Sequence, residues 1–379
     1  MEPLQKLFLL GESAKYDLCS SIRSSKEERF SHLIYPAMLP QGGCINLFKV
    51  LLTNLCEGEC FYCVNHCNRP RKLLKFQPEE LSRLFMDFYQ KGYVQGLFLS
   101  SGLGEDSNKT QEEMIKAVEI LRFRNRFKGY VHLKILPGAR NELVERSIDL
   151  ADRVSINLEA PSEERLRRIS KNKVNYNDLL GKIGFIKKTI ERGNLKRDQT
   201  TQFVVGAADE SDSEILTRVS GLYQEYRLKR VYFSAFEPIP QTPFEEKASV
   251  PPMREHRLYQ ADFLLRDYGF SLWEIPLEEN GNLSMEFDPK MKYALNHPEL
   301  YPVEVNRADY LTLLKVPGIG PRSARRIVDS RKKDPIKNKD CLKASGAVLK
   351  RCLPFITMAG KKVEEITEPT PLFRFSGIP

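Results

Sequence analysis

Short apolar runs alternate with amphipathic stretches from residue 45 to about residue 240. The amphipathic stretches predict helices: in the segment 78–91, Leu81, Leu84 and Phe85 recur at helical spacing, and Gly92 follows as a stop signal. Six repeated strand–helix units predict an α/β fold with a parallel sheet and right-handed crossovers, two strands short of a closed barrel. The predicted strands are Leu47–Leu52, Gly96–Ser100, Tyr130–Ile135, Arg153–Leu158, Thr201–Val205 and Arg230–Phe236.

The start of the second helix is predicted from a Thr-x-x-Glu pattern. Thr110 and Glu113 have the spacing of a capping box, so we expect the helix to begin at Thr110. A third helix is expected after Ser213, where apolar residues again recur at helical spacing.

Changes in pattern along the chain predict five segments. Residues 1–44 form a mixed N-terminal extension, and residues 45–240 form the α/β domain. Residues 241–300 begin with a proline-rich turn, continue into a helix and contain the only tryptophan, Trp273, so we expect a lid or a connecting segment. Residues 301–360 form a small helical module, and residues 361–379 form a tail.

Composition places this 379-residue chain among soluble globular proteins, with 41% hydrophobic and 29% charged residues. No apolar run has the length of a membrane span, and the first residues lack the pattern of a secretory signal. Clustered thiols favour a reducing compartment, so we expect a cytoplasmic protein. The net charge of +9 is concentrated in residues 301–360, which hold 13 Lys or Arg against 5 Asp or Glu, and this block predicts a polyanionic partner.

Three cysteines, Cys56, Cys60 and Cys63, follow the first predicted strand with the spacing C-x3-C-x2-C. Thiolates are the usual ligands of iron–sulfur clusters, and a 4Fe–4S cluster has four ligand positions. Three cysteines at this spacing predict a cluster in which one iron stays open to a small molecule, as a catalytic metal keeps a free position.

A structural zinc site is the alternative interpretation of the same segment. His66 and Cys67 follow closely and could complete a tetrahedral ligand set. Zinc modules usually pair two short cysteine hooks across a longer loop, and here no second hook is present, so we favour the cluster. A second cluster that involves Cys44 or Cys67 stays open at this stage.

The cysteine spacing, with Tyr62 directly before the third cysteine, resembles the signature of the radical S-adenosylmethionine (SAM) superfamily. The resemblance implies a partial (β/α)6 barrel, a 4Fe–4S cluster on the three cysteines and SAM on the fourth iron. It also implies that the reduced cluster cleaves SAM to a 5′-deoxyadenosyl radical, with electrons from a small protein such as a flavodoxin or ferredoxin.

The same resemblance implies SAM contacts at the carboxyl ends of the strands. Ser101 and Gly102 stand after the second strand, where superfamily members receive the SAM amino group. Gln202 and Gly206 belong to the fifth strand, which resembles the strand that contacts adenine. On the fourth predicted strand, Ser155, Asn157 and Glu159 share one face because side chains alternate, and this polar face suits ribose or the methionyl carboxylate.

The C-terminal module contains the run Val316-Pro-Gly-Ile-Gly-Pro321 between two predicted helices. Gly318 and Gly320 permit a tight turn whose backbone N–H groups can bind phosphate at a helix N-terminus, and Arg322, Arg325 and Arg326 add positive charge. The run resembles a helix-hairpin-helix motif, a reader of the DNA backbone that contacts phosphates without specifying sequence. Cys341–Cys352 is similar to a degenerate second copy, in which Ser345-Gly346 replaces the Gly-x-Gly turn.

The chain resembles the DNA modification/repair radical SAM proteins over almost its whole length, in the segments Lys49–Cys56, Gly96–Gly102 and Glu255–Asp262 and in the terminal helix-hairpin-helix motif. The resemblance implies a radical SAM enzyme that acts on a nucleotide in DNA. Two alternatives remain: an RNA-modifying radical SAM enzyme, and a non-catalytic DNA-binding protein with a structural iron–sulfur or zinc site.

Overall fold

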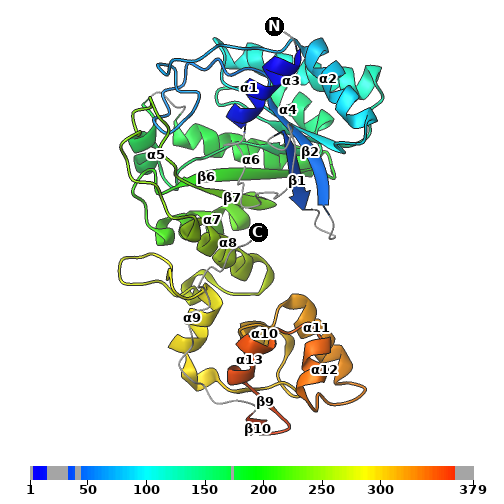
Figure 1. Ribbon diagram of the computed structural model, residues 1–379, viewed down its shortest axis with the longest axis vertical. Coiled ribbons are helices and arrows are strands. Elements are labelled where there is room, and N and C mark those ends of the chain that lie inside the picture. Colours follow the sequence, from blue (N-terminus) through cyan, green and yellow to red (C-terminus); the bar gives the residue numbers. More distant parts are fainter. Residues whose placement is uncertain (1–2, 15–32, 39–43, 172–174, 363–379) are drawn as a thin grey trace. The chain divides into compact units, whose positions relative to one another are not determined.

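The computed structural model describes residues 3–14, 33–38, 44–171 and 175–362. The chain divides into two compact units (Figure 1). The barrel unit lies within Met1–Glu210 and Gly221–Val250, and the hairpin unit within Ser211–Ser220 and Pro251–Pro379. Most of the expected N-terminal extension and of the expected tail lies outside the described residues.

The barrel unit is built on one seven-stranded sheet whose strands follow chain order. β1 pairs antiparallel with β2, and every later neighbour pairs in parallel, so six parallel strands form the partial barrel that the sequence predicts. The antiparallel edge strand was not predicted. The strands are β1 (Ile34–Met38), β2 (Cys44–Leu51), β3 (Gly96–Ser100), β4 (Tyr130–Lys134), β5 (Arg153–Ser155), β6 (Asp198–Val205) and β7 (Arg230–Ala235).

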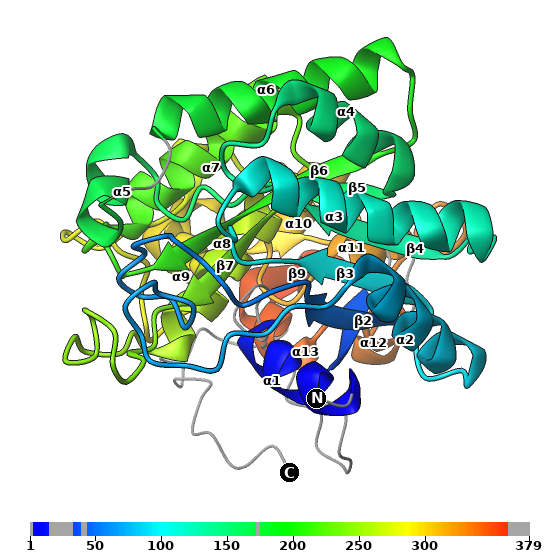
Figure 2. The same cartoon turned by 90° about the horizontal axis from the view of Figure 1, so that it is seen from above.

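Helices cover one face of this curled sheet, as Figure 2 shows for α2, α3, α4 and α6. Apolar strand residues pack beneath them; the Phe48 ring, for example, lies 6.0 Å from Phe85 and 5.1 Å from Phe88 of α2. The opposite face carries polar side chains such as Lys49 and His132, both buried. The helices are α1 (Pro3–Ala14), α2 (Pro78–Gln90), α3 (Ser107–Glu119), which continues into η2 (Ile120–Arg124), α4 (Asn141–Leu150), α5 (Glu163–Ile169) and α6 (Tyr176–Arg192). Helix α7 (Asp212–Tyr226) is divided between the two units.

Two local predictions in this unit were wrong. Helix α3 begins at Ser107, because the Asp106 side chain caps it by accepting from the N–H groups of Asn108 and Lys109, while the Thr110 hydroxyl donates to the Leu103 carbonyl. The fourth parallel strand, β5, ends at Ser155 instead of continuing to Leu158. The alternation of side chains between the two faces of a strand therefore does not apply to Asn157 and Glu159, which follow β5.

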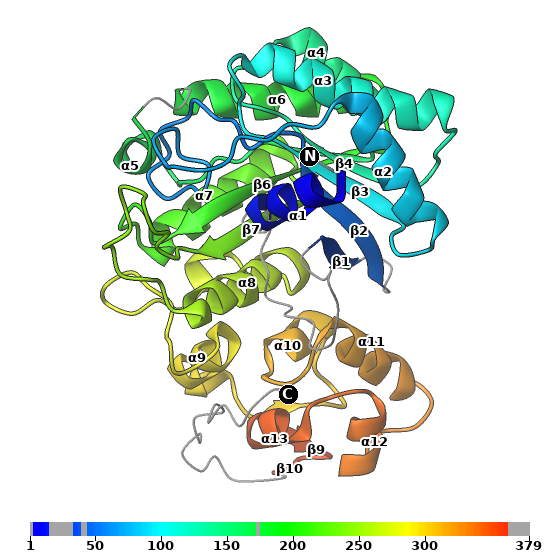
Figure 3. The same ribbon diagram turned by 45° about the horizontal axis from the view of Figure 1, so that its top comes forward.

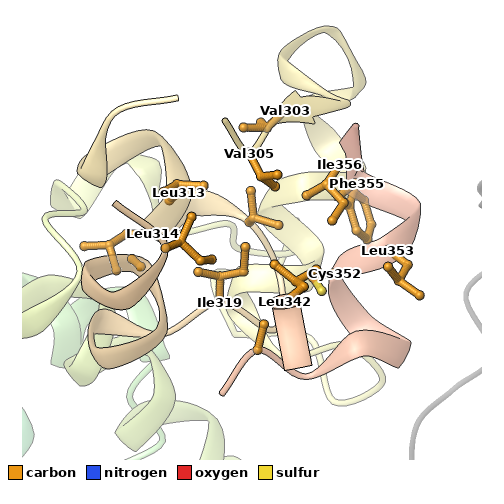
Figure 4. Close-up of a cluster of buried hydrophobic side chains, with 14 of the residues drawn as sticks. Val303, Val305, Leu313, Leu314, Ile319, Leu342, Cys352, Leu353, Phe355 and Ile356 are labelled. Atoms are coloured by element: carbon orange, nitrogen blue, oxygen red, sulfur yellow. The ribbon is translucent and has the colours of Figure 1, made fainter. Parts of the chain in front are cut away.

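The hairpin unit contains four short helices, α10 to α13, packed around a common apolar core (Figures 3 and 4). Leu313, Ile319, Leu342 and Cys352 are fully buried in that core. The elements are α8 (Pro252–Asp267), η3 (Leu272–Glu274), α9 (Pro289–Asn296), η4 (Pro298–Leu300), β8 (Val303–Glu304), α10 (Tyr310–Lys315), α11 (Pro321–Ser330), α12 (Lys339–Ala344), α13 (Leu349–Cys352), η5 (Leu353–Phe355), β9 (Ile356–Met358) and β10 (Lys361–Lys362).

A small three-stranded sheet joins the segment before these four helices to the segment after them. β8 precedes α10 and pairs in parallel with β9, which follows α13, so the start and end of the module are joined. Within the described ranges, no helix has the length and apolar character needed to cross a bilayer.

Leu313→Ala tests this core against an exposed neighbour on the same helix. Removing the fully buried Leu313 side chain leaves a cavity, and we expect a loss of about 2–5 kcal/mol of unfolding free energy. Leu311→Ala is the matched control, because that side chain is 58% exposed, and we expect a change within about 0.5 kcal/mol. Denaturant titration followed by far-ultraviolet circular dichroism measures the unfolding free energy of both variants; equal effects of the two changes would contradict the packing.

Candidate functional site

The three cysteines lie on the loop that follows β2, at the carboxyl edge of the parallel sheet. Backbone N–H groups within the loop point at two of the sulfurs: Gly58 N lies 3.3 Å from the Sγ of Cys56, and Asn65 N lies 3.4 Å from the Sγ of Cys63. Hydrogen bonds to sulfur stabilise thiolate ligands and tune the clusters that they bind. The loop thus directs backbone N–H donors at the sulfurs of Cys56 and Cys63.

Arg71 fixes the shape of this loop. Its guanidinium donates to the carbonyl oxygens of Asn54 at 3.0 and 3.2 Å, of Asn65 at 3.0 Å, and of His66 and Arg69. Burial lowers the pKa of Arg71, although the nearby thiols of Cys56, Cys63 and Cys67 act in the opposite direction. The guanidinium thus places a positive charge beside these sulfurs.

The loop after β3 approaches the cysteine loop so closely that Gly102 has no room for a side chain. A Cβ at that position would lie 2.2 Å from the Leu55 carbonyl oxygen. Gly102 N donates to the carbonyl of Thr53 at 2.8 Å, and Cys56 bridges to Gly104. The structure therefore gives Gly102 a role in positioning Cys56, which holds whether or not it also contacts a cofactor.

Ser101 lies beside Gly102, at the carboxyl end of β3. Its Oγ is buried and has no hydrogen-bond partner among the described residues. Because buried hydroxyl groups are nearly always paired, an orphaned one next to the cysteine loop indicates a place for a ligand's polar group. This observation fits the expected contact of Ser101 with SAM.

Tyr62 and Glu159, predicted separately from the sequence, meet in the structure. The Tyr62 hydroxyl donates to the Glu159 carboxylate, and desolvation, followed by the charges of Glu159, Cys60 and Cys63, raises the pKa of Tyr62 well above its usual value. Glu159 has a φ of 66°, and its backbone bridges to Phe203 of β6. This left-handed turn, and not strand alternation, directs the Glu159 carboxylate toward the cysteine loop.

Ser155 and Asn157 are both buried, but Ser155 already has a protein partner. Its Oγ lies 2.9 Å from Nε2 of His132, whose pKa is held well below its usual value by burial and by the nearby cations Arg153 and Lys134. A neutral imidazole can serve this hydroxyl as donor or acceptor. The three residues predicted to share one strand face therefore have different surroundings.

Gln202 and Gly206 lie on or just after β6. The Gln202 backbone carbonyl accepts from Glu159 N at 2.9 Å, which brings this strand to the segment after β5. Gly206 has a φ of 81°, and its N–H donates to the Glu210 carboxylate, which also accepts from Ala208 N at 3.1 Å. The structure thus places Gly206 in a turn that Glu210 stabilises.

Two segments that are distant in sequence contact the middle of the cysteine loop. Cys60 bridges to Ser170 after α5, with their Sγ and Oγ atoms 3.6 Å apart. The Phe61 ring lies 5.4 Å from Phe244, and Phe244 N donates to the Phe61 carbonyl. Residues from the proline-rich turn therefore contact the cysteine loop directly.

The donor set fits a cluster bound by three thiolates. Among the described residues, no three His, Cys, Asp or Glu side chains form a group that could hold a single metal ion. A cubane cluster keeps its cysteine ligands on different irons, so it does not require them to converge on one point. Cys44 begins β2, about 23 Å of extended strand from the loop, and so cannot belong to the same site; Cys67 lies within the loop.

In the hairpin unit, the first Gly-x-Gly turn packs against the second motif. Gly318 has a φ of 81°, and a Cβ there would lie 2.7 Å from the Val348 carbonyl oxygen; the Gly318 carbonyl accepts from Val348 N at 2.9 Å. Gly320 caps α11 and lies against the Tyr268 hydroxyl. The buried Lys290 ammonium, whose pKa is lowered to about 7 chiefly by burial, donates to the Ile319 carbonyl.

The second turn is the more accessible one. Gly346 is exposed and has a φ of 90°, and a Cβ there would lie 3.3 Å from the Ser323 Oγ and 3.6 Å from Nη1 of Arg326. Arg322 and Arg325 are also exposed on α11. The two motifs thus combine into one surface, in which an arginine of the first lies beside the glycine turn of the second.

Comparisons with known families agree with this arrangement. A sequence model of the radical SAM superfamily matches residues 50–220, and one of the helix-hairpin-helix motif matches residues 301–348. The chain therefore contains a radical SAM domain and a helix-hairpin-helix motif. The match bears out the expected superfamily domain and the expected cofactors, since this superfamily uses a 4Fe–4S cluster and SAM.

Similar solved structures include methylornithine synthase (PylB), with a TM-score of 0.47 and 12% identity over 57% of this chain and 60% of that chain. The FeFe-hydrogenase maturase HydG from Carboxydothermus hydrogenoformans gives a TM-score of 0.44 and 16% identity over 57% of this chain and 50% of that chain. The chain thus spans 60% of the length of the first of these proteins and half of the second. No curated protein sequence matches the chain.

Sequence reasoning missed Arg71 and Ser170. The loop carries two arginines, Arg69 and Arg71, and nothing in the linear pattern distinguishes the one that binds the carbonyls of Asn54 and Asn65. Ser170 contacts Cys60 only because α5 ends beside the loop.

Arg71→Gln should loosen the cysteine loop, because the shorter neutral amide cannot reach the same carbonyl oxygens. We expect a reconstituted cluster to lose iron to a chelator faster, with retention weakened roughly 10–100-fold, as for other residues that orient metal ligands. Lys72→Gln is the matched control, since that side chain is exposed and adjacent. Equal iron loss in the two variants would contradict the role of Arg71.

Proposed function

We propose that this protein is a radical SAM enzyme that modifies or repairs a nucleotide in DNA. The observation that carries the proposal is the presence, in one chain, of a thiol loop at the carboxyl edge of a half-barrel and a basic helix-hairpin-helix module. The first supplies a site for radical chemistry, and the second supplies a surface for a phosphate backbone.

In this proposal, Cys56, Cys60 and Cys63 would hold a 4Fe–4S cluster, and SAM would bind beside it. When bound, these groups supply the 5′-deoxyadenosyl radical that abstracts a hydrogen atom from the substrate. The protein's own task is to orient these groups: Arg71 holds the loop through its backbone carbonyls, and Phe244 packs against Phe61 within it. The proposed SAM-contacting residues are Tyr62, Ser101, Gly102, Ser155, Asn157, Glu159, Gln202 and Gly206.

The charge of the hairpin unit supports DNA as the partner. Residues 301–360 carry 13 Lys or Arg against 5 Asp or Glu, and Arg322, Arg325 and Arg326 are exposed beside the turns. Backbone phosphates attract such a surface irrespective of sequence. A base inside a duplex cannot enter a half-barrel, so the target nucleotide has to be flipped out or single-stranded.

The cysteines test the catalytic half of the proposal. Anaerobically reconstituted protein, reduced and given SAM, should release 5′-deoxyadenosine, and Cys56→Ala, Cys60→Ala or Cys63→Ala should abolish release because each leaves the cluster one ligand short. Cys44→Ala is the matched control and should retain activity, since Cys44 lies at the opposite end of β2.

The outcomes separate the alternatives. Stoichiometric zinc, or a full cluster with no SAM cleavage, would leave a non-catalytic DNA-binding protein. Cleavage that structured RNA stimulates and duplex DNA does not would favour the RNA-modifying enzyme. A flavodoxin or ferredoxin that replaces the chemical reductant would identify the class of electron donor.

Variants of three exposed arginines in the hairpin unit test the proposed DNA binding. Changing Arg322, Arg325 and Arg326 together to Gln should weaken duplex binding and lower the slope of log affinity against log salt by about one for each phosphate that is no longer neutralised. The charge-matched control changes Arg167, Arg168 and Arg192 to Gln, which are exposed on helices of the barrel unit. Titration of labelled duplex at several salt concentrations measures both; equal slopes would refute the assigned surface.

A further inference from the structure

Trp273 is the only tryptophan in the chain, and it is 83% exposed. It lies in η3, the turn that follows α8 in the hairpin unit. A tryptophan contributes a large apolar surface that folding normally buries, so an indole left this exposed among the described residues points to a contact beyond them.

The turn that carries Trp273 is rigid. Glu274 and Ser271 form a capping box, and the Glu274 carboxylate accepts from Ser271 N at 2.9 Å, from the Tyr293 hydroxyl at 3.4 Å and from the Lys315 ammonium. Burial opposes ionisation of Glu274, but the hydrogen bonds from Lys315 and Ser271 hold its pKa below the usual value. The indole is therefore presented from an ordered support.

The residues around Trp273 contact α10, the helix that leads into the first glycine turn. Gly269 lies against Leu311 in the first turn of α10: a Cβ added at Gly269 would lie 3.3 Å from Cδ2 of Leu311. Glu274 pairs with Lys315 at the end of the same helix. Trp273 thus lies next to the helix whose last residue directly precedes the hairpin.

We propose that Trp273 stacks on an unpaired nucleobase of the DNA strand whose backbone the hairpin unit binds. The inference rests on the proposed DNA binding and adds to it a preference for distorted or single-stranded sites. An aromatic face accepts any base, and basic groups beside it hold the backbone, which is the combination that single-strand binders use. Such a contact would favour DNA in which a base is already unstacked.

The single tryptophan makes the test direct, because the intrinsic tryptophan fluorescence of the full-length protein comes from Trp273 alone. A labelled duplex and the same duplex with a one-nucleotide bulge are titrated, and both label anisotropy and tryptophan emission are recorded. We expect both DNAs to bind but only the bulged one to quench the emission strongly.

Trp273→Ala should weaken binding to the bulged DNA by roughly 5- to 150-fold, the range of base–aromatic stacking, and change duplex binding by less than about twofold. Trp273→Phe is the conservative variant and should restore part of the affinity. Because the side chain is exposed, circular dichroism should show both variants folded.

Anisotropy that shows binding while emission is unchanged, or equal loss of affinity for both DNAs in Trp273→Ala, would overturn the stacking role and leave the proposed DNA binding intact. Absence of binding to either DNA would overturn both. Quenching that is equal for duplex and bulged DNA would overturn the preference for an unpaired base.

Discussion

Parallel pairing of β2 to β7 in chain order is the constraint on which the cofactor site depends. Strands joined by right-handed crossovers all end at one edge of the sheet, so the loops after β2, β3, β5 and β6 meet there. The meeting is close only because Gly102 lacks a side chain and can lie against the Leu55 carbonyl. Any Cβ at that position would push the two loops apart and displace Cys56.

The same packing places the charged and polar side chains that surround the cysteine loop at this edge of the sheet. The Arg71 guanidinium is held by backbone carbonyls rather than by a carboxylate, so its positive charge remains available to the neighbouring thiols. Tyr62 and Glu159 form a hydrogen bond on another side of the loop, where desolvation keeps the phenol protonated. Electrostatic interactions are strong in such poorly solvated surroundings, which suits a site that has to stabilise thiolates.

The hairpin unit presents a basic surface instead of a thiol loop, and its form depends on how its two motifs pack. Its two motifs share one apolar core, so the turn at Gly318 packs against the second motif while Gly346 is exposed beside Arg326. Lys315 links this core to the turn that presents Trp273. In the proposals made above, backbone attraction and base stacking are independent contributions, and their combination would favour DNA with an unpaired base.

The sequence by itself determined the six strand–helix repeats, the C-x3-C-x2-C loop and the Gly-x-Gly hairpin, because periodicity and spacing are local properties of the chain. It could not determine that β5 stops at Ser155, that Glu159 turns toward Tyr62, or that Arg71 organises the cysteine loop. These features depend on pairs of groups brought together from distant parts of the chain. Only the tertiary structure decided them, since packing and backbone hydrogen bonding select one partner among several that are equivalent in sequence.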